Sequence, residues 1–429
     1  MKVLFTLHQG NMFSGGQGVY TAHVTRELAR LGHDVHLIVG PPWPDTDPAV
    51  TVHRVPSYSV YRLLETGRFF FYGRPWRSFF HPLNFYELAT SRMGQFSVMS
   101  AFSWRAFETW RALQPHERFD IVHDVQVLGY GTLMMHASGM PVVANIHHPL
   151  AIDRANQMRQ ATRLGWMLRV AMFYPFWMQE VVARRLDRII TGSENSRRSV
   201  QRAFRLRDEQ ITAIHDGVDT GVFRPLEVPK RQGMILFVGN SEDRNKGAKF
   251  LLEAVRILKD RGIDFHLVFK DRLDAEMAPR LAEQLGVRDR LTFVGRLPVD
   301  ELARLYNEAE VLVSPSVYEG FGLPAAEANA CGTPVVATTA GAFPEVIADG
   351  ETGILVPPAD PRALADAIAS LLADPARRRA MGAAGARRVA ERFSWRACAQ
   401  ATAALYDDVL SARRTNRDHG ARAGLAAMA

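Results

Sequence analysis

Two glutamates, Glu319 and Glu327, stand on either side of the short turn Gly320-Phe321-Gly322-Leu323. The apolar run from Ala309 to Val313 predicts a buried strand before the turn, and Pro324 is typical of the first turn of a helix after it. Such a turn directs backbone N–H groups and the positive end of a helix at one point, which suits a phosphate. Flanking carboxylates accept hydrogen bonds from sugar hydroxyls, so the pattern indicates a nucleotide-sugar site. The alternative is an ordinary turn in which Glu327 caps the helix or faces solvent.

The turn resembles the E-x7-E motif of glycosyltransferase family 4, a family of retaining enzymes with the GT-B fold. Segments 332–337, 341–347 and 349–356 are also similar to that family, and the similarity extends over most of residues 234–395. The resemblance implies an α/β protein in which two Rossmann-like, doubly wound domains face each other across a cleft. It implies transfer of a hexose from a UDP- or GDP-linked sugar to a hydroxyl acceptor.

The resemblance also implies roles for the residues of the motif. Glu319 would hold hydroxyls of the donor sugar, and Glu327 would hold the ribose. No side chain attacks the sugar in the mechanism inferred for such enzymes, because the departing diphosphate helps to take the acceptor proton. The donor-binding residues expected in this turn are Gly320, Phe321, Gly322, Leu323 and Glu327.

A second glycine loop, from Val238 to Gly247, follows an apolar run and leads into a helical pattern. Family members commonly carry an arginine directly after the first glycine of this loop and a lysine just before the second. These cations neutralise charge on the departing diphosphate. Lys246 matches the lysine, but Asn240 stands where the arginine is usual. We expect Arg244 to substitute for it, with Asn240 giving a neutral hydrogen bond; a solvated basic turn is the alternative.

Two further donor-site candidates follow strands in the first half of the chain. Gly16 belongs to a glycine pair after the strand expected at Val3–Leu7, where a missing Cβ lets the backbone approach a phosphate or sugar. His147 follows the strand expected at Val142–Ile146. A histidine at this position is common in the family and binds the donor sugar near its reacting carbon, so the expected catalytic set is His147, Lys246 and Glu319. A buried structural histidine is the alternative.

Candidate acceptor contacts are Asp124 and Gln126, at the end of the strand expected to begin at Ile121, and His148, after the strand expected at Val142–Ile146. Loop capping is the alternative for Asp124 and Gln126. Adjacent histidines rarely share one metal ion without a third ligand. The Asp45-Thr46-Asp47 sequence lies in a proline-rich loop and is interpreted as a turn. The resemblance implies no divalent ion. We therefore expect no metal site and no cofactor, since the nucleotide sugar is a substrate.

Alternating strand and helix patterns predict two doubly wound parallel sheets. The expected divisions are an acceptor-side domain at 1–226, a nucleotide-sugar domain at 227–394, a crossover helix at 395–412 that packs back on the first domain, and a flexible tail at 413–429. The proline-containing segment from Asp219 to Gln232 is the expected linker.

Length and composition limit the class of protein. The 429 residues suffice for two α/β domains, and the two cysteines, Cys331 and Cys398, suit a reducing compartment. The N-terminal run from Met1 to Leu7 predicts a strand and not a secretory signal. No stretch reaches about 18 uncharged apolar residues, so we expect a cytoplasmic protein without a transmembrane helix.

The net charge of +7 is unevenly distributed. Residues 1–200 hold 21 Lys and Arg against 14 Asp and Glu, whereas the rest of the chain holds 31 of each. Dispersed arginines without a nucleic-acid-binding motif make a nucleic acid partner unexpected. Segments 58–110 and 159–188 combine aromatic residues with arginines. They predict either helices packed against the sheet or a surface that binds an anionic membrane.

The second interpretation places the protein peripherally at the inner membrane face, with a lipid-linked or membrane-proximal glycan as acceptor. The alternatives are a soluble small-molecule acceptor and a non-catalytic nucleotide-sugar-binding module. An epimerase of the same fold is a further alternative, against which the E-x7-E layout argues.

Overall fold

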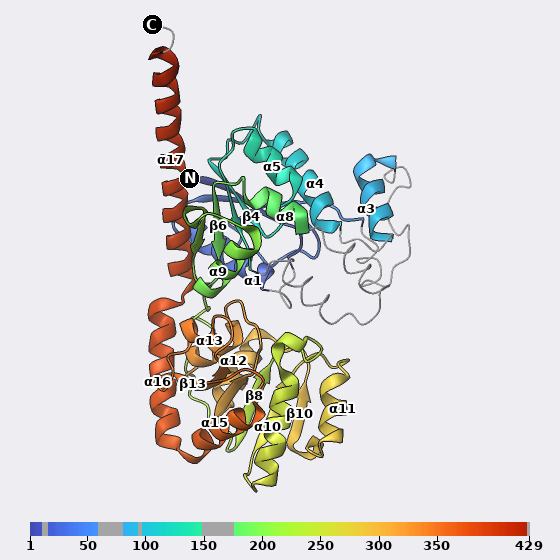
Figure 1. Cartoon of the computed structure of the whole chain (residues 1–429), viewed down its shortest axis with the longest axis vertical. Coiled ribbons are helices and arrows are strands. Elements are labelled where there is room, and N and C mark those ends of the chain that lie inside the picture. The colour runs from blue at the N-terminus through green and yellow to red at the C-terminus, as the bar shows by residue number, and fades with distance from the viewer. Residues whose placement is uncertain (11–15, 59–79, 93–96, 148–175, 427–429) are drawn as a thin grey trace. The chain divides into compact units, whose positions relative to one another are not determined.

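The computed structural model describes residues 1–10, 16–58, 80–92, 97–147 and 176–426 (Figure 1). Its contacts divide the chain into two compact units. Unit 1 comprises Met1–Gly192, Ser196–Ile214 and Ala399–Ala429, and unit 2 comprises Ser193–Asn195 and His215–Cys398. Each unit contains one parallel sheet covered by helices, which confirms the predicted α/β fold.

The sheet of unit 1 has the strand order β3-β2-β1-β4-β5-β6-β7, and its described pairs are all parallel. Its strands are β1 (Lys2–Leu7), β2 (Asp34–Val39), β3 (Thr51–Arg54), β4 (Ile121–Val125), β5 (Val142–Asn145), β6 (Arg188–Thr191) and β7 (Ile211–Ala213). Its helices are α1 (Gln17–Arg30), α3 (Pro82–Arg92), α4 (Val98–Leu113), α5 (Tyr130–Ala137), α8 (Phe176–Ala183) and α9 (Glu194–Phe204).

Side chains on β4 alternate between the two faces of this sheet, as a strand requires. Asp124 bonds to Thr132 of α5 on one face, where α4, α5 and α8 pack together (Figure 1). His123 contacts Tyr20 of α1 and Tyr406 of the C-terminal helix on the other face. Near its carboxyl end, β4 therefore has one buried polar side chain on each face of the sheet, His123 and Asp124.

The sheet of unit 2 has the order β10-β9-β8-β11-β12-β13. Its strands are β8 (Met234–Val238), β9 (His266–Lys270), β10 (Leu291–Val294), β11 (Val311–Ser314), β12 (Val335–Thr338) and β13 (Gly353–Val356). Its helices are α10 (Ala248–Asp260), α11 (Met277–Gln284), α12 (Val299–Glu308), α13 (Leu323–Ala330), α14 (Phe343–Val346), α15 (Pro361–Ala373) and α16 (Pro375–Arg392). The strand order reverses between β8 and β11, and the crevice at the carboxyl ends of two such strands is where open α/β sheets bind ligands.

The last helix, α17, runs from Trp395 to Ala426 and contributes its residues from Ala399 onward to unit 1. It anchors there through Arg413, which donates to both carboxylate oxygens of Asp187 at 2.7 and 2.9 Å. The helix extends through most of the segment 413–429 that we expected to be a flexible tail. Flexibility of that segment stays a prediction.

Edge strands and the unit boundary differ from the sequence expectation. Strands β3, β7 and β13 were not predicted; β3 is solvent-accessible along its length, and β7 has only three residues. The units divide between Ile214 and His215, whereas the sequence suggested 226 and 227. The segment expected to be a linker contributes the buried Phe223 to the core of unit 2, so its prolines mark a packed loop. Among the described helices, none is long and apolar enough to cross a membrane.

Candidate active site

Lys246 and Glu319 form an ion pair at the carboxyl end of the unit 2 sheet. Lys246 ends the short 3-10 helix Arg244–Lys246 after β8, and Glu319 lies in the loop after the neighbouring strand β11. The Lys246 ammonium donates to both carboxylate oxygens of Glu319, at 3.2 and 2.9 Å. Burial opposes the charge of Lys246, but the charge and hydrogen bonds of Glu319 outweigh it and raise the pKa of the lysine. The structure thus brings together two of the three predicted catalytic residues.

Ser316 is a partner of Glu319 that the sequence did not single out. Its hydroxyl donates to Glu319 Oε2 at 3.2 Å, and its own carbonyl accepts from the Thr338 hydroxyl. A carboxylate has about four acceptor positions, so bonds from Lys246 and Ser316 leave capacity for ligand hydroxyls. An ammonium has three donors, and one remains beyond the two directed at Glu319.

The Glu319 loop is held by two close backbone approaches. A Cβ on Gly341, whose φ is +62°, would lie 2.0 Å from the Glu319 carbonyl oxygen. A Cβ on Gly247, whose φ is +66°, would lie 2.0 Å from the carbonyl oxygen of Pro315. The Val317 N–H also donates to the Asn245 carbonyl at 2.8 Å. The loop after β8 and the loop after β11 therefore position each other.

The turn after Glu319 has the predicted strand-to-helix geometry. Gly322, with a φ of 96°, is the N-cap of α13, and Pro324 lies in the first turn. The first N–H groups of a helix have no partner within it, so the backbone at Gly322 and Leu323 can face an anion. Phe321 is buried and packs 5.8 Å from the ring of Phe393. Its side chain anchors the turn in the core, and the assignment of Phe321 as a donor-binding residue stays a prediction.

Glu327 lies one turn inside α13 and accepts a hydrogen bond from the Tyr306 hydroxyl at 2.7 Å. Burial raises the pKa of Glu327 to about 7, against the opposing effects of that hydrogen bond and of the charge of Lys270. Tyr306 and Lys270 were not identified from the sequence. Lys270 ends β9 and has no motif around it, whereas Tyr306 lies within the helical pattern 299–308, where it is typical of a core residue.

The loop after β8 carries Asn240 and Arg244, both of which are exposed. The Asn240 side-chain oxygen accepts the backbone N–H of Glu242 at 3.1 Å, so it shapes the loop and does not take the place of a cation. Asp243 accepts the N–H of Asn245 and caps the 3-10 helix that begins at Arg244. Arg244 and Lys246 therefore lie on one capped turn.

In unit 1, Gly16 is the N-cap of α1 with a φ of +70°, and a Cβ there would meet nothing within 4 Å. His147 lies just beyond β5, with its ring 4.7 Å from that of Tyr20 in an edge-to-face arrangement. Its backbone N–H donates to the side-chain oxygen of Gln126 at 3.0 Å. Gln126 is buried, has a φ of 61° and holds the His147 backbone, so the structure gives it a positioning role and corrects its assignment as an acceptor contact.

Asp124 was expected to contact the acceptor, but its carboxylate is completely buried. It accepts the N–H groups of Val127 and Leu128 and the Thr132 hydroxyl, which together hold the turn between β4 and α5. Burial raises the pKa of Asp124 to about 6. Loop capping is therefore the correct interpretation, because its oxygens are occupied by the protein itself. His148, the third candidate acceptor residue, lies outside the described residues.

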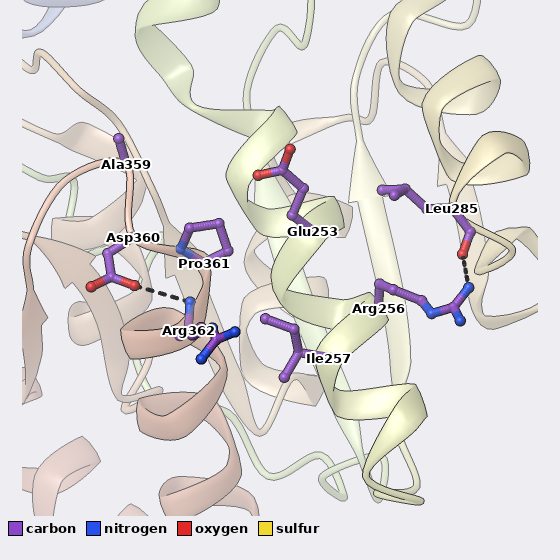
Figure 2. Close-up of a pocket in the computed structure, with 8 residues that line it drawn as sticks. All are labelled: Glu253, Arg256, Ile257, Leu285, Ala359, Asp360, Pro361 and Arg362. Atoms are coloured by element: carbon purple, nitrogen blue, oxygen red, sulfur yellow. Dashed lines mark hydrogen bonds between the residues drawn. The ribbon is translucent and has the colours of Figure 1, made fainter.

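The described residues contain no group of three or more His, Cys, Asp or Glu side chains that could hold a metal ion. A surface pocket of about 560 Å³ lies in unit 2 between α10 and the start of α15 (Figure 2). Figure 2 shows Arg256 bonded to the Leu285 carbonyl and Asp360 capping α15. None of the candidate site residues lines this pocket, so it is separate from the site around Lys246.

Comparisons with known proteins identify the family of this chain. Residues 220–388 match the family described as glycosyl transferases group 1, and residues 15–217 match the glycosyl transferase 4-like domain. The chain is 37% identical over 417 residues to the MMP α-(1→4)-mannosyltransferase of Mycolicibacterium hassiacum, covering 96% of this chain and 99% of that protein.

Two solved structures share the fold. Sucrose-phosphate synthase from Thermosynechococcus elongatus superposes with a TM-score of 0.73 and 24% identity, covering 96% of this chain and 100% of that one. HepE of Anabaena, solved with UDP and glucose, gives a TM-score of 0.67 and 17% identity over 95% of this chain and 99% of that one. The fold and the site define a glycosyltransferase of the GT-B class. The chain belongs to glycosyltransferase family 4, as its sequence motifs predicted.

Proposed function

We propose that the enzyme transfers a mannosyl group from a nucleoside-diphosphate mannose to a hydroxyl of a glycan acceptor. The observation that carries this proposal is the Lys246–Glu319 pair at the strand-order reversal of unit 2, beside the N-terminus of α13. The identity of the sugar and an α-(1→4) product are taken from the mycobacterial mannosyltransferase that covers nearly the whole chain. An α product from a donor with an α-linked phosphate retains the configuration at the reacting carbon.

In this proposal the charges of the site act on the diphosphate. Lys246 uses its remaining donor on a phosphate oxygen, and the N–H groups that begin α13 add the field of a helix N-terminus. Arg244, on the same turn as Lys246, extends over the diphosphate as it leaves. Stabilising charge that develops in the transition state is the usual source of most catalytic acceleration.

The hydroxyl-binding groups orient the donor. Glu319 binds hydroxyls of the sugar while Lys246 and Ser316 keep its carboxylate in place, and Glu327 binds the ribose. The resemblance to the family assigns His147 to the donor sugar near its reacting carbon, and the proposal keeps that role. The departing phosphate takes the acceptor proton, so no nucleophilic side chain and no divalent ion are needed.

A thermal-shift panel of nucleotide sugars tests the donor. A ligand at 100 times its dissociation constant stabilises a protein by about 2.7 kcal/mol, which is readily measured. GDP-mannose should raise the unfolding temperature most, with UDP-glucose and ADP-glucose as comparisons. The anomeric coupling of the product, measured by NMR, then tests retention. A β product, or the same response to every nucleotide sugar, would contradict the proposal.

A lipid-linked or membrane-proximal acceptor is a second candidate, which exposed aromatic side chains of unit 1 favour. Phe80, Phe85 and Trp177 are exposed by 75%, 65% and 68%. The whole excess of positive charge also lies in residues 1–200. Apolar side chains near basic residues are typical of surfaces that bind anionic membranes reversibly. The arginines 159, 163 and 169 of the second aromatic-basic segment lie outside the described residues.

Co-sedimentation with vesicles distinguishes the two acceptor classes. Binding that rises with the fraction of anionic lipid, falls with salt and is weakened by Phe85→Ser with Trp177→Ser supports a membrane acceptor. Val299→Ser, at an exposed apolar residue of unit 2, is the matched control and should leave binding unchanged. A protein that co-sediments with neither neutral nor anionic vesicles would support a soluble acceptor.

A further inference from the structure

His123 lies near the middle of the unit 1 sheet and is completely buried. Its ring stacks on Phe5 of β1 with centroids 4.5 Å apart, and its Nδ1 lies 2.5 Å from the hydroxyl of Tyr406. Tyr406, also completely buried, belongs to α17 and is 283 residues further along the chain. Burial, and then the charge of nearby His147, lower the pKa of His123 to about 3, so its ring is neutral at ordinary pH.

Polar atoms beside this ring are buried without partners. Within the described part of the chain, His123 Nε2 makes no hydrogen bond, and neither do the side-chain Nδ2 and Oδ1 of Asn145. Asn145 is completely buried. The register pairs Asn145 with Val125, two residues after His123, so both polar side chains face the same side of the sheet. Buried polar atoms of this kind destabilise a fold, and their presence requires an internal water or a functional reason.

The same group of side chains extends to His147, two residues after Asn145. The Tyr20 ring contacts His147 at 4.7 Å and lies 6.2 Å from His123, so it bridges the two imidazoles. Gln126 holds the backbone of His147 from the neighbouring strand end. His147 therefore contacts the same tyrosine ring as His123, and its backbone is held by Gln126.

The geometry points to a positioning role for Tyr406, His123 and Asn145. They form a buried polar layer, completed by internal water at His123 Nε2 and the Asn145 amide, that fixes the ring of His147 toward the donor sugar. This inference rests on the proposed function, because that function assigns His147 to the donor. Apolar side chains of the same shape would make the folded protein more stable, but they could not orient the His147 imidazole through hydrogen bonds.

Removal of one hydroxyl provides the first test. Tyr406→Phe keeps the packed ring but loses the bond to His123. The kcat for mannosyl transfer should fall by roughly 10-fold or more with little change in donor KM, because small misplacements of a catalytic group reduce the rate strongly. Val409→Ala, at a buried residue of the same helix, should lower the unfolding temperature and leave kcat unchanged. An unchanged kcat in Tyr406→Phe overturns the inference.

A second variant separates positioning from packing. Asn145→Leu is nearly isosteric and removes the unpartnered amide. We expect it to raise or hold the unfolding temperature while kcat falls. A protein that becomes more stable and keeps its full kcat would show that the polar layer has no role in the reaction.

A third readout does not depend on the identity of the reaction. In protein labelled with ¹⁵N-histidine, Tyr406→Phe should shift the imidazole resonances of both His123 and His147, whereas Val409→Ala should not. If His147→Ala leaves donor turnover unchanged, the proposed role of His147 in donor binding is wrong. The resonances then still show whether the buried polar layer determines the orientation of the His147 ring. Unshifted His147 resonances would overturn the inference.

Discussion

The Lys246 ammonium donates to both carboxylate oxygens of Glu319, although 73 residues separate them in the chain. They meet because their loops follow β8 and β11, which are neighbouring parallel strands. The charge of Lys246 is therefore already paired with the Glu319 carboxylate of the protein itself. In the proposed function the pair shares its hydrogen bonds with hydroxyls and phosphate oxygens of the donor, so Glu319 and Lys246 act as a unit.

Substitution of either member should reduce turnover more than donor binding. Lys246→Ala and Glu319→Ala are each expected to lower kcat by roughly 100- to 1,000-fold, as loss of a charge-stabilising group does in other enzymes. The double variant should be less impaired than the product of the two effects, because residues in contact are not additive. Steady-state kinetics measure this, with Lys249→Ala, at an exposed lysine of α10, as the control. Full activity in Glu319→Ala would contradict its assignment.

Arg244 should neutralise part of the negative charge of the diphosphate, because Asn240 is uncharged and cannot do so. Arg244→Ala is expected to lower kcat by about 10-fold, a smaller loss than for Lys246→Ala because Arg244 is exposed and screened. Asn240→Arg should restore part of this loss. The control is Arg256→Ala, an exposed arginine of α10 that is paired with Asp260. Unchanged kinetics in Arg244→Ala would mean that Lys246 and the backbone amides suffice.

The pKa of Glu327 predicts a pH dependence of donor affinity. Burial raises this pKa to about 7, so the carboxyl is largely protonated below that pH and accepts weaker hydrogen bonds from ribose hydroxyls. The donor dissociation constant should therefore rise as pH falls from 8 to 6 in the native protein. Glu327→Gln should bind more weakly at pH 8 and show a flat profile. Parallel profiles for the two proteins would exclude Glu327 as the titrating group.

The same group has an effect of opposite sign on stability. Between its ordinary pKa near 4.5 and its native pKa of about 7, the folded state binds more protons at Glu327 than the unfolded state. The contribution of Glu327 to the free energy of unfolding therefore decreases as pH rises through this range. Thermal unfolding of Glu327→Gln, compared with the native protein from pH 4.5 to 8, should lack this decrease.

Gly341→Ala should disturb the Glu319 loop. The new Cβ would lie 2.0 Å from the Glu319 carbonyl oxygen at a φ of +62°, so the loop must move. Gly350→Ala is the matched control, because its φ is +76° but no atom lies within 4 Å of the new Cβ. The control should lose only about 1–2 kcal/mol of stability for the left-handed backbone. Gly341→Ala should lose more, together with most of its kcat. Equal losses in both variants would contradict the close-approach argument.

Divalent ions should have no effect on turnover. The diphosphate charge is assigned to Lys246, Arg244 and the N-terminus of α13. Excess EDTA should therefore leave the rate nearly unchanged. Loss of activity that magnesium or manganese restores would show that the charge assignment is incomplete.

The sequence by itself determined the family, the two parallel α/β units and the elements around the candidate donor site. The apolar runs that form β1, β8 and β11 were recognisable because strands buried on both faces are rich in apolar residues. The glycine turn, Lys246 and both glutamates were recognisable because their spacing along the chain is itself the motif.

Only the tertiary structure decided which polar side chains form hydrogen bonds within the protein and which remain available to a ligand. Asp124 looked like an acceptor contact, but its oxygens hold the turn that follows it, and Phe321 is buried in the core. Tyr306 meets Glu327, and Tyr406 meets His123 from the far end of the chain. These contacts arise from the packing of helices on the sheets, which brings together residues with no fixed spacing in the sequence. Local patterns record backbone geometry and burial, whereas the partner of a buried polar group depends on which distant element covers it.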